Sequence, residues 1–193
     1  DSVVKEALIK YNLYYDKNNL PEYAGDLSTL YNQKIGPLEG LNVAGLIWYQ
    51  GESNGSRSEL YDLEFDLLKR SWSKAFGYAN EDMPVIFTQV APYYRHDINM
   101  GDNQLGYLSM YMERAWKLSE AKNTAMLTIY DLPLEHVKDG ESSDPIHPRT
   151  KTPIGERFAK SAINMVYGGN KEYTAPVYKT MDINDGAIYI TLD

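Results

Sequence analysis

The sequence predicts an α/β protein in which helices flank a parallel sheet to give three layers. Three runs of apolar and β-branched residues alternate with stretches whose apolar residues recur at helical spacing. The order strand, helix, strand, helix, strand, helix favours parallel strands, because each connecting helix returns the chain to the same end of the sheet. Three strands are fewer than the about five or six that a sheet usually has, and we therefore expect only part of a larger sheet.

The first predicted strand is a continuous apolar run, a pattern typical of a strand that is buried on both faces. The three runs cover residues 43–49, 85–90 and 125–130. Ligands bind to parallel sheets at the carboxyl ends of the strands, so the segments that follow these runs are the places to look for a site. Those segments are residues 50–55, 91–97 and 131–149.

The first two predicted helices are bounded by different signals. Apolar residues at helical spacing indicate a helix within residues 3–11, ahead of a stretch that contains Asn and Pro. Ser56 and Glu59 form a capping box, so we expect the second helix to start there and to end near Gly77.

The last two predicted helices follow the second and third strands. Apolar residues at helical spacing indicate one helix over about residues 105–118. Thr152 as N-cap and Pro153 at the first helical position open the other helix, because Pro needs no backbone donor there. The pair at 168–169, Gly-Gly, is expected to stop it.

The sequence changes character after Gly169. Asp185 and Gly186 lie between two short β-prone runs, which is a strong signal for a hairpin. We expect residues 1–169 to form part of one α/β domain, and residues 170–193 to be the start of a separate, truncated β-rich module. The opening residues include no initiator Met and no apolar signal region, so we expect a piece of a longer polypeptide.

Composition and charge argue against several classes of function. Nineteen Lys and Arg against 27 Asp and Glu give a net charge of −8, which disfavours binding to nucleic acid or to an anionic membrane surface. No apolar run approaches the roughly 18 residues of a membrane span. The absence of Cys excludes a disulfide framework, a thiolate metal site and a Cys nucleophile.

An Asp and a His stand three residues apart in the loop after the third strand. In Asp144 and His147 this spacing suits an acid–base pair, in which the imidazole takes a proton from a nucleophile and the carboxylate fixes its tautomer. Pro145 and Pro148 stiffen the turn. An ordinary acidic surface loop is the alternative interpretation of the spacing alone. A metal site is disfavoured, because His136 and His147 are not at ligand spacing.

The loop after the first strand carries the second candidate. Residues 51–55 match Gly-x-Ser-x-Gly, which between a strand and a helix is typical of a nucleophile elbow with Ser53 as nucleophile. A second interpretation is a polar helix-entry loop in which Ser53 and Asn54 satisfy backbone donors. In a third, the Gln50 amide donates to an oxyanion and the Glu52 carboxylate orients a base.

Several separated segments keep the order of motifs found in one family of enzymes. They are residues 30–38, 48–54, 89–93, 144–148 and 148–157. Together they resemble the sialate O-acetylesterase family, which is a carbohydrate-esterase branch of the SGNH hydrolases, and the likeness spans about residues 20–168. The sequence departs from the family pattern at Gln33 and Lys34 and again at Glu113 and Arg114, which bears on the substrate pocket.

The resemblance implies an SGNH-hydrolase fold, which is flavodoxin-like, and a role for each candidate residue. The family's nucleophile is a Ser in an upstream Gly-Gln-Ser-Asn motif that this sequence lacks, so Ser53 is not expected to be the nucleophile. His147 is implied to be the general base. Asp144 is implied to be its main orienting acid, with help from Glu52. The residues implied to bind the oxyanion or the substrate are Gln50, Gly51 and Asn54.

The function that the resemblance implies is that of a carbohydrate O-acetylesterase, a serine-type hydrolase that needs no metal and no organic cofactor. Its substrate is expected to be an O-acetylated sugar, and its partner the upstream segment of the same polypeptide, without which the piece is expected to be inactive. The implied location is periplasmic, secreted or lysosomal. The alternatives are an α/β-hydrolase that uses Ser53, and a non-catalytic carbohydrate-binding or scaffold fragment.

Overall fold

The computed structural model describes residues 30–91, 104–119, 123–132, 150–169, 176 and 178–192. The helix predicted within residues 3–11 lies outside these ranges. The strands, in chain order, are β1 (Leu46–Trp48), β2 (Val85–Thr88), β3 (Thr124–Leu127), β4 (Tyr178–Asn184) and β5 (Ala187–Leu192). The longer helices are α2 (Tyr61–Ala75), α3 (Gln104–Ser119) and α4 (Thr152–Met165). The short helices are η1 (Tyr31–Ile35), η2 (Gly36–Leu38), η3 (Glu52–Leu60) and η4 (Ala79–Glu81).

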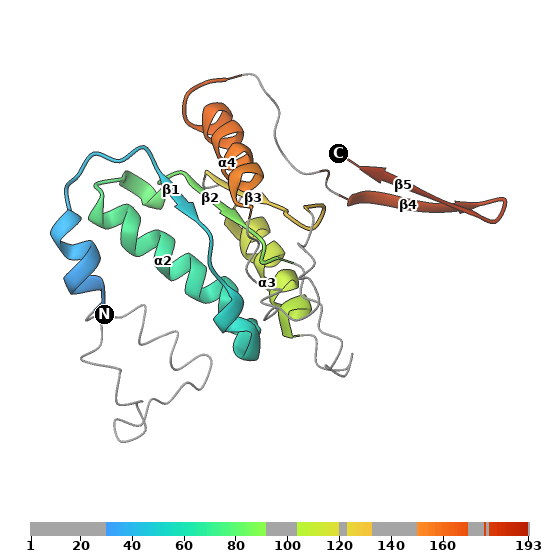
Figure 1. Cartoon of the computed structure of the whole chain (residues 1–193), viewed down its shortest axis with the longest axis horizontal. Helices are drawn as coiled ribbons and strands as arrows, with labels where there is room; N and C mark the ends of the chain where they lie inside the picture. The colour runs from blue at the N-terminus through green and yellow to red at the C-terminus, as the bar shows by residue number, and fades with distance from the viewer. Residues whose placement is uncertain are drawn as a thin grey trace.

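The structure confirms the predicted parallel sheet. Strands β1, β2 and β3 lie side by side in that order, and both pairs are parallel (Figure 1). In the register, Ile86 of β2 stands between Ile47 of β1 and Ala125 of β3. Because the strands are parallel, the loops that leave their carboxyl ends begin at one edge of the sheet.

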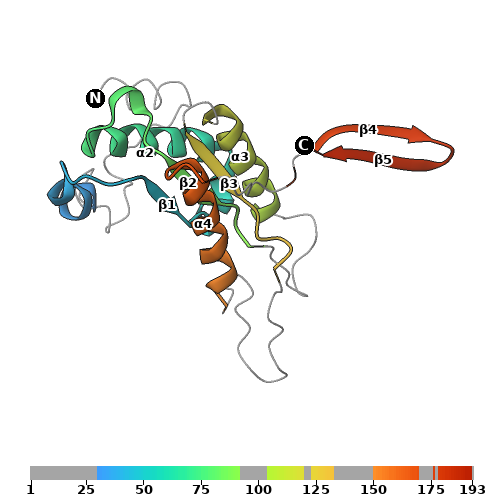
Figure 2. The ribbon, with the colours of Figure 1, turned by 90° about the horizontal axis from the view of Figure 1, so that it is seen from above.

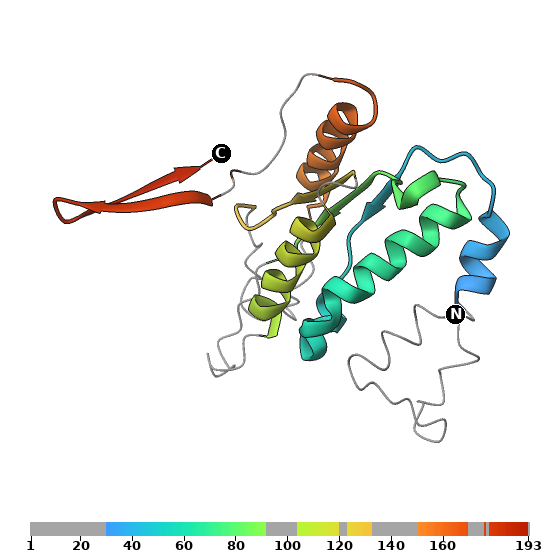
Figure 3. The ribbon, with the colours of Figure 1, turned by 180° about the vertical axis from the view of Figure 1, so that it is seen from behind.

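Helices cover both faces of the sheet, which gives the predicted three layers. Figures 2 and 3 show α2 and α3 on one face and α4 on the opposite face. Phe65 of α2 and Leu108 of α3 pack with Phe87 of β2 in one apolar core. The second core joins α4 to the sheet, with members that include Ile86, Leu127, Ile154 and Phe158. Buried apolar side chains on both faces of β2 therefore hold the sheet between the helices.

The prediction for the first strand was wrong in its length and in its burial. The predicted run was residues 43–49, but β1 contains only Leu46–Trp48, and the Ile47 side chain is 57% exposed. The physical reason is the position of β1 at an edge of the described sheet. Helix α4 packs over β2 and β3, so no described element covers Ile47 on that face.

The start of the second helix also differs from the prediction. Residues 52–60 form the 3₁₀ helix η3, and α2 begins at Tyr61 without a side-chain cap, so the capping box of Ser56 and Glu59 is absent. Arg57 interrupts η3 with φ −144° and ψ 40°. The Ser, Asn and Gly residues of this stretch are weak helix formers, because Ser and Asn side chains bond to nearby backbone groups in turns and Gly loses the most backbone entropy in a helix.

The remaining helix predictions are confirmed to within a residue or two. Helix α2 ends at Ala75, followed by Gly77 with φ +76°, and α3 spans the predicted stretch. Helix α4 begins at Thr152, so Lys151 takes the N-cap position that the sequence assigned to Thr152. Gly168, with φ +68°, follows the end of α4. No helix within the described ranges is long and apolar enough to cross a membrane.

The hairpin predicted at the end of the chain is present. Strands β4 and β5 are antiparallel and are joined by Asp185 and Gly186, which have φ values of 49° and 74°. Positive φ at both positions matches the twist of a two-residue hairpin turn. The hairpin stands apart from the helices and the parallel sheet (Figure 1).

Candidate active site

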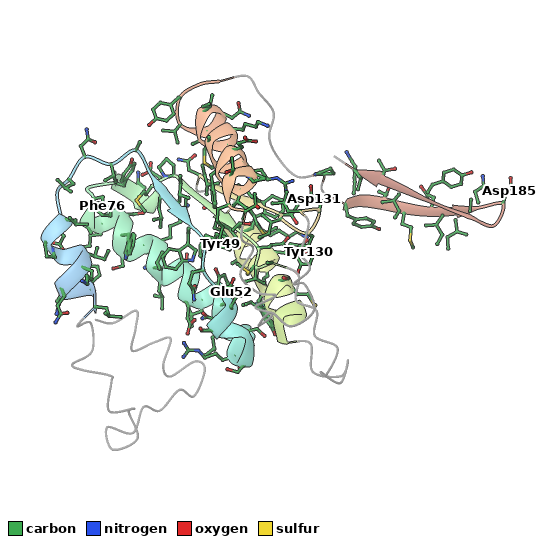
Figure 4. All side chains as sticks on the ribbon, in the orientation of Figure 1. Tyr49, Glu52, Phe76, Tyr130, Asp131 and Asp185 are labelled. Carbon is green, nitrogen blue, oxygen red and sulfur yellow. The ribbon has the colours of Figure 1, made fainter. Side chains whose placement is uncertain are left out.

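The candidate site lies where β1 and β3 end. Figure 4 shows Tyr49 and Glu52 just beyond β1, while Tyr130 and Asp131 lie beyond β3. Four residues that the sequence singled out come together at the end of β1: Gln50, Gly51, Glu52 and Asn54. The proposed acid–base pair, Asp144 and His147, lies outside the residues that the structure describes, so its geometry stays a prediction.

A chain of hydrogen bonds links three polar side chains at the end of β1. Gln50 Nε2 donates to Asn54 Oδ1 at 2.8 Å, and Asn54 Nδ2 donates to Glu64 Oε2 at 2.6 Å. The other carboxylate oxygen of Glu64 lies 3.7 Å from an Arg57 nitrogen. Asn54 is buried, so its two bonds hold the Gln50 amide in a defined orientation. Nothing in the sequence pattern indicated Glu64 or Arg57.

The backbone of this loop is held by the same group of residues. The Asn54 amide donates to the Gly51 carbonyl at 2.7 Å, and the Tyr61 hydroxyl donates to the Gln50 carbonyl at 3.3 Å. Burial raises the pKa of Tyr61, so its phenol stays protonated and remains a donor at physiological pH. The side-chain amide of Gln50 is therefore held by Asn54 of η3, and its backbone carbonyl is held by Tyr61 of α2.

Close packing leaves little room for a side chain at Gly51. A Cβ atom there would lie 3.0 Å from Val90 Cγ1, 3.4 Å from Leu108 Cδ2 and 3.5 Å from Met112 Cε. Val90 follows β2 and the other two belong to α3, and all three are fully buried. The loop therefore passes directly against the core, which sets the height of Gln50 and Glu52 above the sheet.

Glu64 and Tyr49 have pKa values that their surroundings raise. Partial burial raises the pKa of Glu64, and the Arg57 charge and the Asn54 hydrogen bond oppose that rise. Burial raises the pKa of Tyr49, with a smaller contribution from the Glu52 charge. The Tyr49 hydroxyl is buried and has no hydrogen-bond partner among the described residues, while Lys151 Nζ lies 4.9 Å from the centroid of its ring.

An ion pair joins the end of β3 to α4. Arg157 donates from both terminal nitrogens to the two carboxylate oxygens of Asp131, at 2.7 and 2.5 Å, and also to the Thr128 carbonyl at 2.6 Å. These bonds lower the pKa of Asp131. They fix the two points at which the chain leaves β3 and enters α4, on either side of the loop that carries Asp144 and His147.

Ser53 does not have the geometry of a nucleophile elbow. Such an elbow places its Ser on a sharp, strained turn between strand and helix. Ser53 is instead an exposed residue of the 3₁₀ helix η3, and it is not among the residues with positive φ. His136 and His147 lie outside the described residues, and within the described residues no group of three His, Asp or Glu side chains gathers as a metal site.

Comparisons with known proteins give one consistent result. No family model matches the chain. The chain is 26% identical to the sialate O-acetylesterase of Mus musculus over 176 residues, which are 86% of this chain and 32% of that protein. It is 24% identical to the Homo sapiens enzyme of the same name, over 81% of this chain and 31% of that protein.

A solved structure extends the comparison to the fold. A carbohydrate acetylesterase from Xanthomonas citri matches with a TM-score of 0.68 and 29% sequence identity, over 92% of this chain and 37% of that one. The chain is thus a relative of the sialate O-acetylesterases by sequence, and it shares part of its α/β fold with the Xanthomonas citri protein. It spans about a third of the length of the curated relatives that it matches.

Proposed function

We propose that the natural full-length protein, a relative of the sialate O-acetylesterases, removes acetyl groups from the hydroxyls of a carbohydrate. The observation that carries the proposal is similarity over 81–92% of the chain to proteins named for that activity. The orientation of Gln50 supports it, because an amide fixed at the carboxyl end of β1 can donate to the oxyanion of ester hydrolysis. O-Acetylated sialic acid is the substrate that we propose.

In the proposed mechanism, a Ser hydroxyl attacks the acetyl carbonyl while the His147 imidazole takes its proton. Asp144 holds the imidazole and stabilises the imidazolium, and Glu52 assists in orienting it. The Gln50 amide donates to the oxyanion that forms. The imidazolium then gives its proton to the departing sugar oxygen, which leaves an acetyl-enzyme. A water molecule deprotonated by His147 attacks the acetyl-enzyme, and the products are acetate and the free Ser.

We place the nucleophilic Ser outside these 193 residues. Ser53 lacks the elbow geometry, and the sequence contains no Gly-Gln-Ser-Asn motif. The chain also matches only 30–32% of the length of the rodent relatives, so most of each relative has no counterpart here. In this proposal the 193 residues alone are inactive, and the segment that bears the Ser completes the site.

The contact between Lys151 and Tyr49 supports a site shared by His147 and Gln50. Lys151 lies over the ring of Tyr49, which is the residue before Gln50 in the chain. Lys151 stands four positions after His147, and four extended steps of backbone span at most about 14 Å. This contact supports the proposed shared site, because it limits how far the backbone at position 147 can lie from Lys151.

The proposal also assigns the two parts of the chain. Residues 1–169 are assigned to an SGNH-type esterase domain, and residues 170–193 to the start of a β-rich module. The distinct antiparallel hairpin β4–β5 supports this division. The location that we propose is periplasmic, secreted or lysosomal, because carbohydrate esterases act on glycans in those compartments.

Acetate release from O-acetylated sialic acid by the full-length protein tests the proposal. Wild type is compared with His147→Ala and with Ser53→Ala. We expect His147→Ala to lower kcat/KM by several orders of magnitude, because it removes the base of the triad. Ser53→Ala is expected to retain activity.

The two other functions have distinct outcomes in the same assay. Loss of activity in Ser53→Ala, with activity of the 193 residues alone, would favour an α/β-hydrolase that uses Ser53. A wild-type protein that binds the sugar without releasing acetate would favour a non-catalytic carbohydrate-binding domain.

A further inference from the structure

The hydrogen bonds between Gln50 and Glu64 have one direction, and the carboxylate sets it. An ionised carboxylate has no proton to donate, so Asn54 must turn Nδ2 toward Glu64. The Oδ1 atom of Asn54 then faces Gln50 and can only accept, so Gln50 must turn Nε2 toward it. This bond uses one N–H of Gln50. The second N–H has no acceptor among the described residues.

A neutral group in place of the Glu64 carboxylate removes this constraint. A carboxylic acid or an amide can donate as well as accept, so Asn54 can then turn by half a rotation and present Nδ2 to Gln50. Gln50 answers by presenting Oε1 to Asn54, and its amide turns over. Its free N–H is no longer held where an oxyanion forms, and a donor at that position is what stabilises the transition state.

We infer that Glu64 is a positioning residue, which acts through Asn54 to keep the Gln50 amide nitrogen available to the ester oxygen. The catalytic consequence rests on the proposed esterase function. Three features hold the hydrogen-bonded residues Gln50, Asn54 and Glu64 in place. Asn54 is buried, Arg57 lies 3.7 Å from the second carboxylate oxygen of Glu64, and the Tyr61 hydroxyl donates to the backbone carbonyl of Gln50. Glu64 itself need not touch the substrate.

The surroundings of Glu64 raise its pKa, which allows its titration to be followed at mildly acidic pH. Partial burial raises its pKa above the ordinary 4.5, and the nearby charges that act on it are Arg57, which lowers the pKa, and Glu59, which raises it. Both belong to η3. Above this pKa the carboxylate fixes the direction of the hydrogen bonds, and below it the two amides are free to reverse.

A polarity exchange in the full-length protein tests the catalytic part of the inference. Glu64→Gln should lower kcat about tenfold with KM within about twofold, because the Gln50 donor is misoriented and not removed. Asn54→Asp with Glu64→Gln restores one direction, since the new carboxylate at position 54 accepts both from the new amide and from Gln50 Nε2. We expect its kcat to lie within about threefold of wild type. Glu59→Gln, an exposed charge change on η3, is the control.

The double variant separates orientation from packing. A loss of packing would be the same or greater in the double variant, so equal impairment of the single and double variants would overturn the inference. So would full activity in Glu64→Gln. If the wild type releases no acetate from any acetylated sugar, the proposed function fails, and the orientation of Gln50 is then decided by a measurement that does not need activity.

That measurement is the pH titration of side-chain amide resonances in protein with ¹⁵N-labelled Asn and Gln. The signals are assigned from Gln50→Ala and Asn54→Ala. We expect both amides to shift together with a midpoint above pH 4.5 in wild type, to shift together at a lower midpoint in Glu59→Gln, and not to shift in Glu64→Gln. Side-chain amide resonances of Gln50 and Asn54 that do not shift with pH in wild type would overturn the inference, whatever the activity.

Discussion

Replacing Gly51 by Ala should destabilise the protein, because the added methyl group enters a filled space. The new Cβ would lie 3.0 Å from Val90 Cγ1, whereas ordinary carbon contacts are about 3.5–4.0 Å. The Val90 methyl must therefore move by a few tenths of an ångström. Val90, Leu108 and Met112 are all fully buried, so none can yield into solvent. Overpacking of this kind costs about 1–3 kcal/mol.

The same substitution at Gly155 supplies the control, with the opposite expected sign. Gly155 is an exposed residue within α4, and a Cβ atom there would have no neighbour within 4 Å. Ala there removes the entropic cost of Gly in a helix and should stabilise by about 0.5–1 kcal/mol. The loop at Gly51 also carries Gln50, so Gly51→Ala should lower esterase activity, and Gly155→Ala should leave it unchanged.

Thermal and urea unfolding of the two full-length variants, beside wild type, measure the difference. For a domain of about this size, 1 kcal/mol shifts Tm by about 2–4 °C, so Gly51→Ala should lower Tm by roughly 2–12 °C. Gly155→Ala should raise it by roughly 1–4 °C. Equal Tm values for Gly51→Ala and wild type would refute the close packing of this loop against β2 and α3.

Two further predictions concern α4. Asp131→Asn should lower stability at about pH 7 and have no effect at about pH 2. The folded-state pKa of Asp131 is lowered, so its ion pair stabilises the protein above the ordinary pKa of 3.8, and this stabilisation is lost as the pH falls through the lowered pKa. Urea midpoints at the two pH values check this, and an equal loss of stability at both would contradict it. Phe158→Ala should destabilise by about 3–5 kcal/mol in urea unfolding, since Phe158 is buried between α4 and the sheet, whereas a loss below about 1 kcal/mol would show that α4 is not packed there.

The parts of the fold that could be predicted are those that local sequence decides. The run at 85–90 is mostly apolar and opens with Val, Ile and Phe, and β2 is buried on both faces as a central strand must be. Asp185-Gly186 accepts positive φ at both positions, so the turn and the pairing of β4 with β5 follow from two residues and their neighbours. Neither feature depends on a distant part of the chain.

The parts that could not be predicted depend on what packs from elsewhere. The run at 43–49 is as apolar as that of β2, yet Ile47 is exposed because α4 crosses β2 and β3 instead of β1. Likewise Ser56 and Glu59 match a capping box in sequence, but Asn54 is already bonded to Gln50 and Glu64 across the turn. The chain therefore follows a 3₁₀ path until Tyr61, and the local cap is not formed.

The residues of the candidate site fall into the same two groups, those that local sequence indicates and those that depend on a contact with another part of the chain. Gln50 and Glu52 could be found from sequence, since polar residues directly after an apolar strand stand out against it. Glu64 could not, because it occupies an ordinary position in an amphipathic helix, ten residues from Asn54. Only the 3₁₀ turn of η3, which brings the start of α2 back over the end of β1, makes that carboxylate a neighbour of the Gln50 amide. Asn54, which bonds to Glu64, belongs to the Gly-x-Ser-x-Gly motif. In the structure this motif does not form a nucleophile elbow, whereas the hydrogen bond between Asn54 and Glu64 does form.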